Sequence, residues 1–280
     1  MRAMTGGSER RALYAGCDLG ISSAKVVIVS NGAIIAGETL PYDNFPHDAA
    51  DAAMQGALRR AGLPPDTVVP CLATGFGDKA VRFAAGTAPH ITCLVRGLRA
   101  LNPRVRTVID VGGHTMRVTN FSGEGELLET AFVEECSGAT GMFLETIAQA
   151  LEIPMDEMAA ALNAAEHPVR ITNTCVVFAE SEVISFINEG YSRYDVFAGV
   201  IDGVASKIGG IARRIDLVPE VAMVGGVAGN ALVRGTVERH LGLTFADLAG
   251  VHPQVVGAFG AALLAGDGCL DGIAEGRGGV

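Results

Sequence analysis

The sequence contains no tryptophan, and aromatic residues make up only 5% of its 280 residues. Its core must therefore be built mainly from Ala, Val, Leu and Ile. Basic residues are outnumbered by acidic ones. The net charge of −10 argues against a protein that binds nucleic acids in general or anionic membrane surfaces. No apolar run reaches the length of a membrane span, and the first residues carry no apolar signal-peptide segment, so we expect a cytoplasmic protein.

Cysteine is present six times, but no C-x-x-C pair occurs, so a self-contained zinc or ferredoxin-type site is not expected. In a cytoplasmic chain these cysteines are expected to be reduced, either as buried thiols or as cofactor ligands. Any cysteine-bound centre must collect its ligands from distant positions. Walker and Rossmann glycine fingerprints are absent as well.

Strand-like and helical segments alternate along the chain, which predicts an α/β protein. The length is sufficient for one large domain or two moderate ones with real cores. The dipeptide Asn31-Gly32 predicts a tight hairpin turn between two strands. We expect strands over 14–18, 25–30, 33–38, 67–73, 105–111, 117–121, 126–132 and 221–224, and helices over 47–61, 91–101, 140–151, 156–164, 175–189, 194–215, from 230 onward and over 253–265.

One segment of the sequence occurs twice. Residues 18–26 read DLGISSAKV and residues 110–118 read DVGGHTMRV, so both contain Asp, an apolar residue, Gly, four further residues, a cation and Val. Each copy leaves an apolar strand, turns at glycine and enters a second strand. The repeat predicts a duplicated α/β fold with a cleft between two related domains. We expect a first domain of 1–103 with 253–280 and a second of 104–252.

The repeated Asp-Gly turns suit the binding of a nucleoside triphosphate. Backbone N–H groups of a glycine-rich hairpin can line a phosphate oxygen, and small side chains permit close approach. Asp18 can hold a hydrated Mg²⁺ while Ser22, Ser23 and Lys25 donate to the same phosphates. A second hairpin at Asp110 would clamp the phosphates from the other side. One such hairpin alone is about as often an ordinary turn, but two copies and a later Gly-Gly turn favour the nucleotide site.

Two cysteines differ from the others in their surroundings. Cys136 lies in a turn of small residues between a strand and a helix, and Cys175 lies at a helix start. A helix N-terminus lowers the pKa of a thiol and stabilises an anionic centre, so both positions suit thiolate ligands. A 4Fe–4S cubane takes four thiolates and one chain supplies two, so the simplest complete site joins two chains. The alternative is a pair of buried structural thiols.

Four motifs, in order, resemble the superfamily of actin, sugar kinases and heat-shock chaperone ATPases. Residues 18–25 resemble its first phosphate loop, 110–117 its second, 224–230 its adenosine loop and 256–262 its final connecting helix. The resemblance implies ATP in the cleft, with Asp18 and Asp110 around Mg²⁺. His114 is a candidate neighbour of the γ-phosphate, and a loop histidine without a role is nearly as common. The resemblance implies further nucleotide contacts from Gly20, Ser22, Ser23, Lys25, Gly112, Gly113 and Thr115 at the phosphates and from Gly225, Gly226 and Asn230 at adenosine.

The cysteine segments narrow the resemblance to one branch. The turn around Cys136 and residues 174–183 are similar to the activators of 2-hydroxyacyl-CoA dehydratases and the ATPase subunits of benzoyl-CoA reductase, and the similarity runs from 15 to 265. It implies a 4Fe–4S cluster held by Cys136 and Cys175 together with two cysteines of a second ATPase subunit, identical or paralogous. It also implies that nucleotide state changes the angle between the subunits. An electron from a ferredoxin-type donor then passes to a reductase or dehydratase that binds acyl-CoA.

The second phosphate loop departs from the pattern of this branch. The branch commonly reads Asp-Ile-Gly-Gly-Gln-Asp-Ser-Lys, whereas this chain has His114 and Thr115 in place of Gln and the second Asp. A loop carboxamide commonly positions the attacking water, so the change bears on hydrolysis more than on ATP binding. A subunit paired with a paralogue tolerates such drift, which favours the delta-type subunit of benzoyl-CoA reductase, with the homodimeric dehydratase activator as the alternative. A cluster-free small-molecule kinase and a non-hydrolysing regulatory member stay open.

Overall fold

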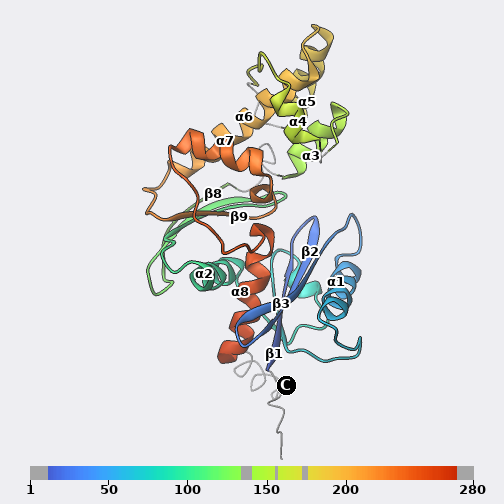
Figure 1. Cartoon of the computed structure of the whole chain (residues 1–280), viewed down its shortest axis with the longest axis vertical. Helices are drawn as coiled ribbons and strands as arrows, with labels where there is room; N and C mark the ends of the chain where they lie inside the picture. Colours follow the sequence, from blue (N-terminus) through green and yellow to red (C-terminus); the bar gives the residue numbers. More distant parts are fainter. Residues whose placement is uncertain (1–11, 134–140, 155–156, 172–175, 270–280) are drawn as a thin grey trace, which may run out of the picture. The chain divides into compact units, whose positions relative to one another are not determined.

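The computed structural model describes residues 12–133, 141–154, 157–171 and 176–269 (Figure 1). The chain divides into two compact units, Met1–Gly97 with Gly257–Val280 and Leu98–Val256. It passes from the first unit to the second within helix α2 (His90–Leu101) and returns at the start of helix α8 (Val256–Leu264). No helix among the described residues combines the length and the apolar character that a membrane span requires.

The first unit contains a five-stranded mixed sheet. Its strand order is β3-β2-β1-β4-β5, in which β1, β2 and β3 are antiparallel neighbours while β4 and β5 run parallel to β1. The strands are β1 (Leu13–Leu19), β2 (Ser23–Ser30), β3 (Ala33–Pro41), β4 (Cys71–Thr74) and β5 (Gly86–Thr87). Helix α1 (Pro46–Arg60) packs on one face of this sheet, and its apolar side completes the core with β1 and β2.

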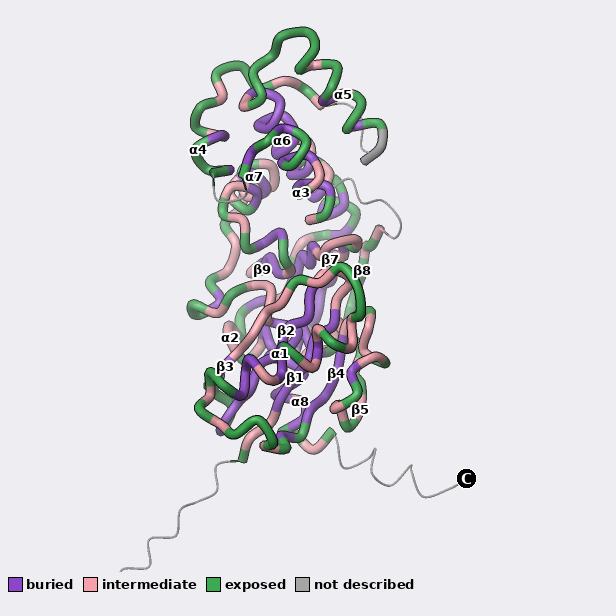
Figure 2. The backbone as a smooth tube through the Cα atoms, turned by 90° about the vertical axis from the view of Figure 1, so that its right-hand side faces the viewer, coloured by how far each residue is buried: buried purple, intermediate pink, exposed green. Residues whose placement is uncertain are grey.

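Strand β1 has side chains of opposite character on its two faces. Ala15, Cys17 and Leu19 belong to the core cluster beneath α1. Gly16 and Asp18 alternate with them and therefore face the side of the sheet that carries α2 and α8. A Cβ added to Gly16 would lie 2.0 Å from the carbonyl oxygen of Ala258 in α8, so only glycine lets this helix approach the strand. The strand is buried along most of its length (Figure 2).

The second unit contains a four-stranded sheet covered by helices. Its strand order is β8-β7-β6-β9, with β9 parallel to β6 and the other neighbours antiparallel. The long helix α6 lies at the centre of the helical layer and contacts α3, α4, α5 and α7. The elements are β6 (Thr107–Val111), β7 (Met116–Phe121), β8 (Leu127–Val133), α3 (Gly141–Ala150), α4 (Met158–Asn163), α5 (Val176–Asn188), α6 (Arg193–Ala212), β9 (Val221–Val224) and α7 (Ala231–Leu241).

Most elements agree with the sequence-based expectation, and the exceptions have local causes. Asn31 and Gly32 both have positive φ, 50° and 78°, and join paired residues Ser30 and Ala33 as the predicted tight turn. The strand expected over 67–73 is wrong in its first half: it begins only at Cys71, because Pro70 has no N–H to donate. The two-residue strand β5 was not expected. The helix expected from 253 begins as a 3₁₀ turn, Pro253–Val255, before α8.

Candidate functional site

The repeated sequence segment forms the same hairpin in both units. In the first, Asp18 pairs with Lys25 across β1 and β2, and in the second Asp110 pairs with Arg117 across β6 and β7. The loops close identically, since the N–H of Gly20 donates to the Ser23 oxygen at 3.0 Å and the N–H of Gly112 to the Thr115 oxygen at 2.9 Å. Asp18 and Asp110 are 6% and 7% exposed. Each unit therefore holds one buried carboxylate at the mouth of a four-residue loop.

The structural repeat continues beyond the part that is visible in the sequence. Strand β4 lies parallel to β1 and ends before Gly75, while β9 lies parallel to β6 and ends before Gly225. These glycines have φ values of 91° and 92°. A Cβ on Gly75 would lie 2.4 Å from Asp18 Oδ1, and a Cβ on Gly225 would lie 3.0 Å from Asp110 Oδ1. Each carboxylate therefore packs against a left-handed glycine that no other residue can replace without strain.

The carboxylate of Asp18 lies between the ammonium group of Lys25 and the imidazole of His90. Lys25 Nζ lies 3.4 Å and His90 Nε2 lies 3.7 Å from Asp18 Oδ2. Burial by itself would raise the pKa of Asp18, but Lys25 and His90 outweigh it and lower that pKa to about 2. Asp18 is therefore ionised at any physiological pH, as a ligand of a hydrated divalent cation must be.

Acid should remove the stabilisation that this carboxylate provides. The folded-state pKa, about 2, lies below the ordinary value of 3.8, so the contribution is complete above pH 4 and disappears as the pH falls through about 2. We expect a loss of about 2 kcal/mol in unfolding free energy across that range. Urea unfolding of the nucleotide-free wild type and Asp18→Asn measures it: the stability difference between them should shrink as the pH falls. A pH-independent difference would contradict the assignment.

Tyr42 fixes the first loop from the end of β3. Its hydroxyl donates to the Gly20 oxygen and its N–H donates to the Ser22 oxygen at 3.0 Å. Burial and the nearby Asp18 raise the pKa of Tyr42, which keeps the hydroxyl protonated. A Cβ on Gly20 would lie 2.8 Å from Lys25 Nζ, so this glycine leaves room for the ammonium group. Ser23 is buried and Ser22 is half-buried.

The second loop presents a different set of side chains. Gly112, Gly113 and His114 are half-buried and Thr115 is exposed. His114 Nδ1 is buried and has no hydrogen-bond partner among the residues that the structure describes. The N–H of Gly141, the first residue of α3, donates to the Gly112 oxygen at 3.1 Å. Helix α3 therefore begins against this loop.

The predicted adenosine residues follow β9. Gly225 needs its left-handed conformation, whereas Gly226 has a helical φ of −62°, and a Cβ there would meet only ordinary contacts. Asn230 caps α7 by accepting hydrogen bonds from the N–H groups of Leu232 and Val233. Its side-chain oxygen is thus engaged within the protein.

The two predicted cluster ligands, Cys136 and Cys175, lie outside the described residues. Within the described ranges, no group of three or more His, Cys, Asp or Glu side chains is arranged to hold a metal ion. Cys17, Cys71 and Cys93 are buried, and burial raises the pKa of Cys17 to about 12 and that of Cys93 to about 11. These thiols stay protonated, as buried structural thiols do.

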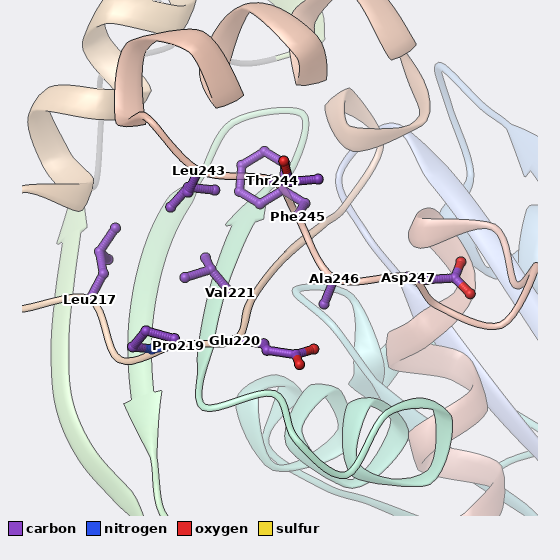
Figure 3. Close-up of a pocket in the computed structure, with 9 residues that line it drawn as sticks. All are labelled: Leu217, Pro219, Glu220, Val221, Leu243, Thr244, Phe245, Ala246 and Asp247. Atoms are coloured by element: carbon purple, nitrogen blue, oxygen red, sulfur yellow. The ribbon is translucent and has the colours of Figure 1, made fainter.

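A shallow cavity of 390 Å³ lies at the opposite end of β9 (Figure 3). Val221 opens the strand and lines this cavity, whereas Gly225 follows the other end of the strand. None of the predicted site residues is among its lining residues, which are Leu217, Pro219, Glu220, Val221, Leu243, Thr244, Phe245, Ala246 and Asp247. The cavity is therefore separate from the candidate site.

Tyr42, His90 and Gly75 contact Asp18 or the loop after it, and they were not predicted as site residues from the sequence. Tyr42 and His90 contact the loop across 22 and 72 positions of sequence, so no local pattern indicates them. Gly75 had one possible signal: it follows a strand end, as Gly225 does.

Known proteins share this architecture. The chain is 36% identical over 251 residues to the activator of lactoyl-CoA dehydratase from Anaerotignum propionicum, covering 89% of this chain and 96% of that protein. The activator of the 2-hydroxyisocaproyl-CoA dehydratase from Clostridium difficile, solved with bound ADPNP, aligns with a TM-score of 0.83 and 30% identity over 95% of this chain and 97% of that one. A benzoyl-CoA reductase subunit from Thauera aromatica is 28% identical over 264 residues, 90% of this chain and 92% of that protein.

These similarities confirm the duplicated actin-like α/β fold. They also favour the dehydratase activators over the benzoyl-CoA reductase subunit. The sequence favoured the benzoyl-CoA reductase subunit because of drift in the second phosphate loop, but the dehydratase activators are more similar over an equal share of the chain. Two changed loop residues therefore say less about which branch this chain resembles than the similarity of the whole chain does. Residues 15–265 match the profile described as the BadF/BadG/BcrA/BcrD ATPase family. The chain belongs to that family of ATPases.

Proposed function

We propose that this chain is the ATP-hydrolysing, iron–sulfur activator of a 2-hydroxyacyl-CoA dehydratase. The observation that carries the proposal is the duplicated hairpin, in which a buried aspartate stands at the mouth of a glycine turn in each unit. Its support is the similarity to dehydratase activators, one of them solved with ADPNP. The runner-up is an ATPase component of benzoyl-CoA reductase, because a subunit of that enzyme is a more distant relative.

The first hairpin suits magnesium and phosphate on its own chemistry. Asp18 offers an ionised carboxylate, and Lys25 places an ammonium group 3.4 Å from it. Gly20 leaves space beside that ammonium group, and the loop N–H groups favour anions. Bound Mg²⁺ would supply positive charge that offsets the negative charge of the phosphates. In the proposal Asp18 and Asp110 hold the hydrated cation, Lys25 with Ser22 and Ser23 binds phosphate, and Gly225, Gly226 and Asn230 surround adenosine.

The second loop carries the residue that we propose orients the water that attacks the γ-phosphate. His114 has a buried Nδ1 without a partner among the described residues, so a ligand atom or a water is the natural partner for it. We assign His114 the place of the carboxamide that orients the attacking water in related loops. Gly112, Gly113 and Thr115 would contact the phosphates beside it.

The cluster is proposed from Cys136 and Cys175 of each of two chains. Four thiolates complete a cubane, and each chain supplies two at helix-start positions of the sequence. The second ATPase subunit is identical in the activator proposal and paralogous in the runner-up. A ferredoxin-type donor would load the cluster, and the dehydratase component that binds acyl-CoA would receive the electron.

Anaerobic purification from the native host tests the function as a whole. We expect ATP turnover, about four iron atoms per two chains, and a dehydratase among the co-purifying proteins. A benzoyl-CoA reductase among them would select the runner-up. Protein that is colourless, free of iron and able to phosphorylate a metabolite would replace both with a kinase, while binding without turnover in the assembled complex would indicate a regulatory member.

Replacing Asp18 by Asn should weaken Mg·ATP binding by at least about tenfold, because the neutral amide no longer attracts the hydrated cation. Isothermal titration calorimetry with ATP and Mg²⁺ measures the change in affinity. Asp66→Asn is the matched control, since Asp66 is exposed and lies outside the site. Equal affinities for the two variants would remove Asp18 from the proposed site.

A further inference from the structure

The surroundings of Asp18 include one histidine to which neither the repeat nor the relatives assign a role. His90 is the first residue of α2, and its Nε2 lies 3.7 Å from Asp18 Oδ2. That distance exceeds a direct hydrogen bond, so the contact is electrostatic, between the imidazole edge and the carboxylate. The protonated ring and the neutral tautomer with its hydrogen on Nε2 both present a positive edge to the oxygen.

The Asp18 carboxylate is enclosed by neighbours on both of its oxygens. Oδ1 faces Gly75, whose added Cβ would lie 2.4 Å away, while Oδ2 faces Lys25 and His90. The start of α8 closes the arrangement: a Cβ on Gly257 would lie 3.0 Å from His90 Nε2 and 3.3 Å from Asp18 Oδ2. His90 is therefore packed between Asp18 and the helix, with 29% of its side chain exposed.

The two polar contacts of Asp18, from Lys25 and from His90, would respond differently to nucleotide binding. In the proposed function Lys25 also donates to phosphate, so part of its attraction for Asp18 is redirected. His90 faces the carboxylate from α2 and is not among the phosphate contacts. Of these two polar partners of Asp18, His90 would then keep the carboxylate from rotating.

We propose that His90 is a positioning residue that holds the Asp18 carboxylate in the orientation that nucleotide-bound Mg²⁺ requires while Lys25 engages the phosphates. The proposal rests on the proposed nucleotide site and adds a residue to it. Its specific consequence is that the loss of His90 weakens binding only when Mg²⁺ is present, because Asp18 contacts the cation and not the nucleotide.

The test compares ATP affinity of the full chain in excess Mg²⁺ and in excess EDTA. We expect His90→Ala to weaken Mg·ATP binding about tenfold, the usual effect of removing a group that orients a metal ligand. Affinity in EDTA should stay within about twofold of wild type. His90→Gln should recover much of the loss, because its amide N–H can reach the same oxygen. His47→Ala is the matched control: His47 lies 3.2 Å from Asp48 in α1, outside the site, and its loss should change neither affinity.

Two results would overturn the role of His90: an unchanged Mg·ATP affinity in His90→Ala, or an equal loss in Mg²⁺ and in EDTA. Thermal unfolding of each variant checks that it folds, and if His90→Ala does not, His90→Leu supplies similar volume without a polar edge. A wild-type chain that binds no ATP would instead overturn the nucleotide site itself. Failure of the site and failure of His90 are thus separate outcomes.

Discussion

Replacing Cys175 by alanine is expected to abolish the iron–sulfur cluster and leave ATP affinity within about twofold of wild type. A cubane that loses one thiolate from each of two chains retains only two protein ligands, and such a cluster is not held. The proposed nucleotide contacts come from other segments of the chain, so binding should persist. Iron analysis and the visible spectrum of anaerobically purified protein measure the first effect, and ATP titration measures the second.

Cys136→Ala should behave in the same way, because both cysteines are proposed as ligands of one cluster. Cys269→Ser is the matched control, since Cys269 is exposed and is not a proposed ligand. We expect iron to fall from about four atoms per two chains to background in the two ligand variants and to stay unchanged in the control. Full iron in either ligand variant would remove that cysteine from the proposed cluster, whatever the ATP affinity.

Replacing Gly260 by alanine is expected to destabilise the first unit by about 3 kcal/mol or more. The added Cβ would lie 1.7 Å from the carbonyl oxygen of Cys93 and 2.9 Å from the nitrogen of Gly97, both in the backbone of α2. Backbone atoms cannot rotate aside as a side chain can, so α8 and α2 must separate. Urea-induced unfolding followed by circular dichroism measures the change.

Gly210→Ala provides the control for this prediction. Gly210 lies inside α6, and a Cβ there would meet nothing within 4 Å. Because alanine is the better helix former, this variant should gain about 0.5–1 kcal/mol of stability. Equal stability changes in the two variants would show that helix propensity, and not the α2–α8 contact, controls the response.

The sequence was sufficient to predict the elements whose signal is local. The turn at Asn31-Gly32 requires two positive φ angles, which that dipeptide supplies. The repeat around Asp18 and Asp110 predicted two equivalent hairpins, and the strand registers agree residue for residue. Strong β-forming runs on either side of a glycine leave few alternatives to a hairpin.

The parts that were missed depend on contacts between distant segments. Tyr42 contacts the loop between β1 and β2 only after β3 has folded back on β2. His90 reaches Asp18 only because α2 crosses that face of the sheet. No spacing rule connects these positions. The strand expected over 67–73 was wrong for a local reason. Val68 and Val69 favour a strand, but Pro70 cannot donate a hydrogen bond and ends the pattern before Cys71.

The equal registers of the two hairpins have a consequence for how this protein diversifies. Both loops span the same four positions between paired residues, Leu19 with Ala24 and Val111 with Met116. Loop length is therefore fixed by the strands, while loop chemistry is free to differ. The first copy has Ser22 and Ser23 where the second has His114 and Thr115. The duplicated hairpin therefore carries different loop side chains on the same strand register in the two units.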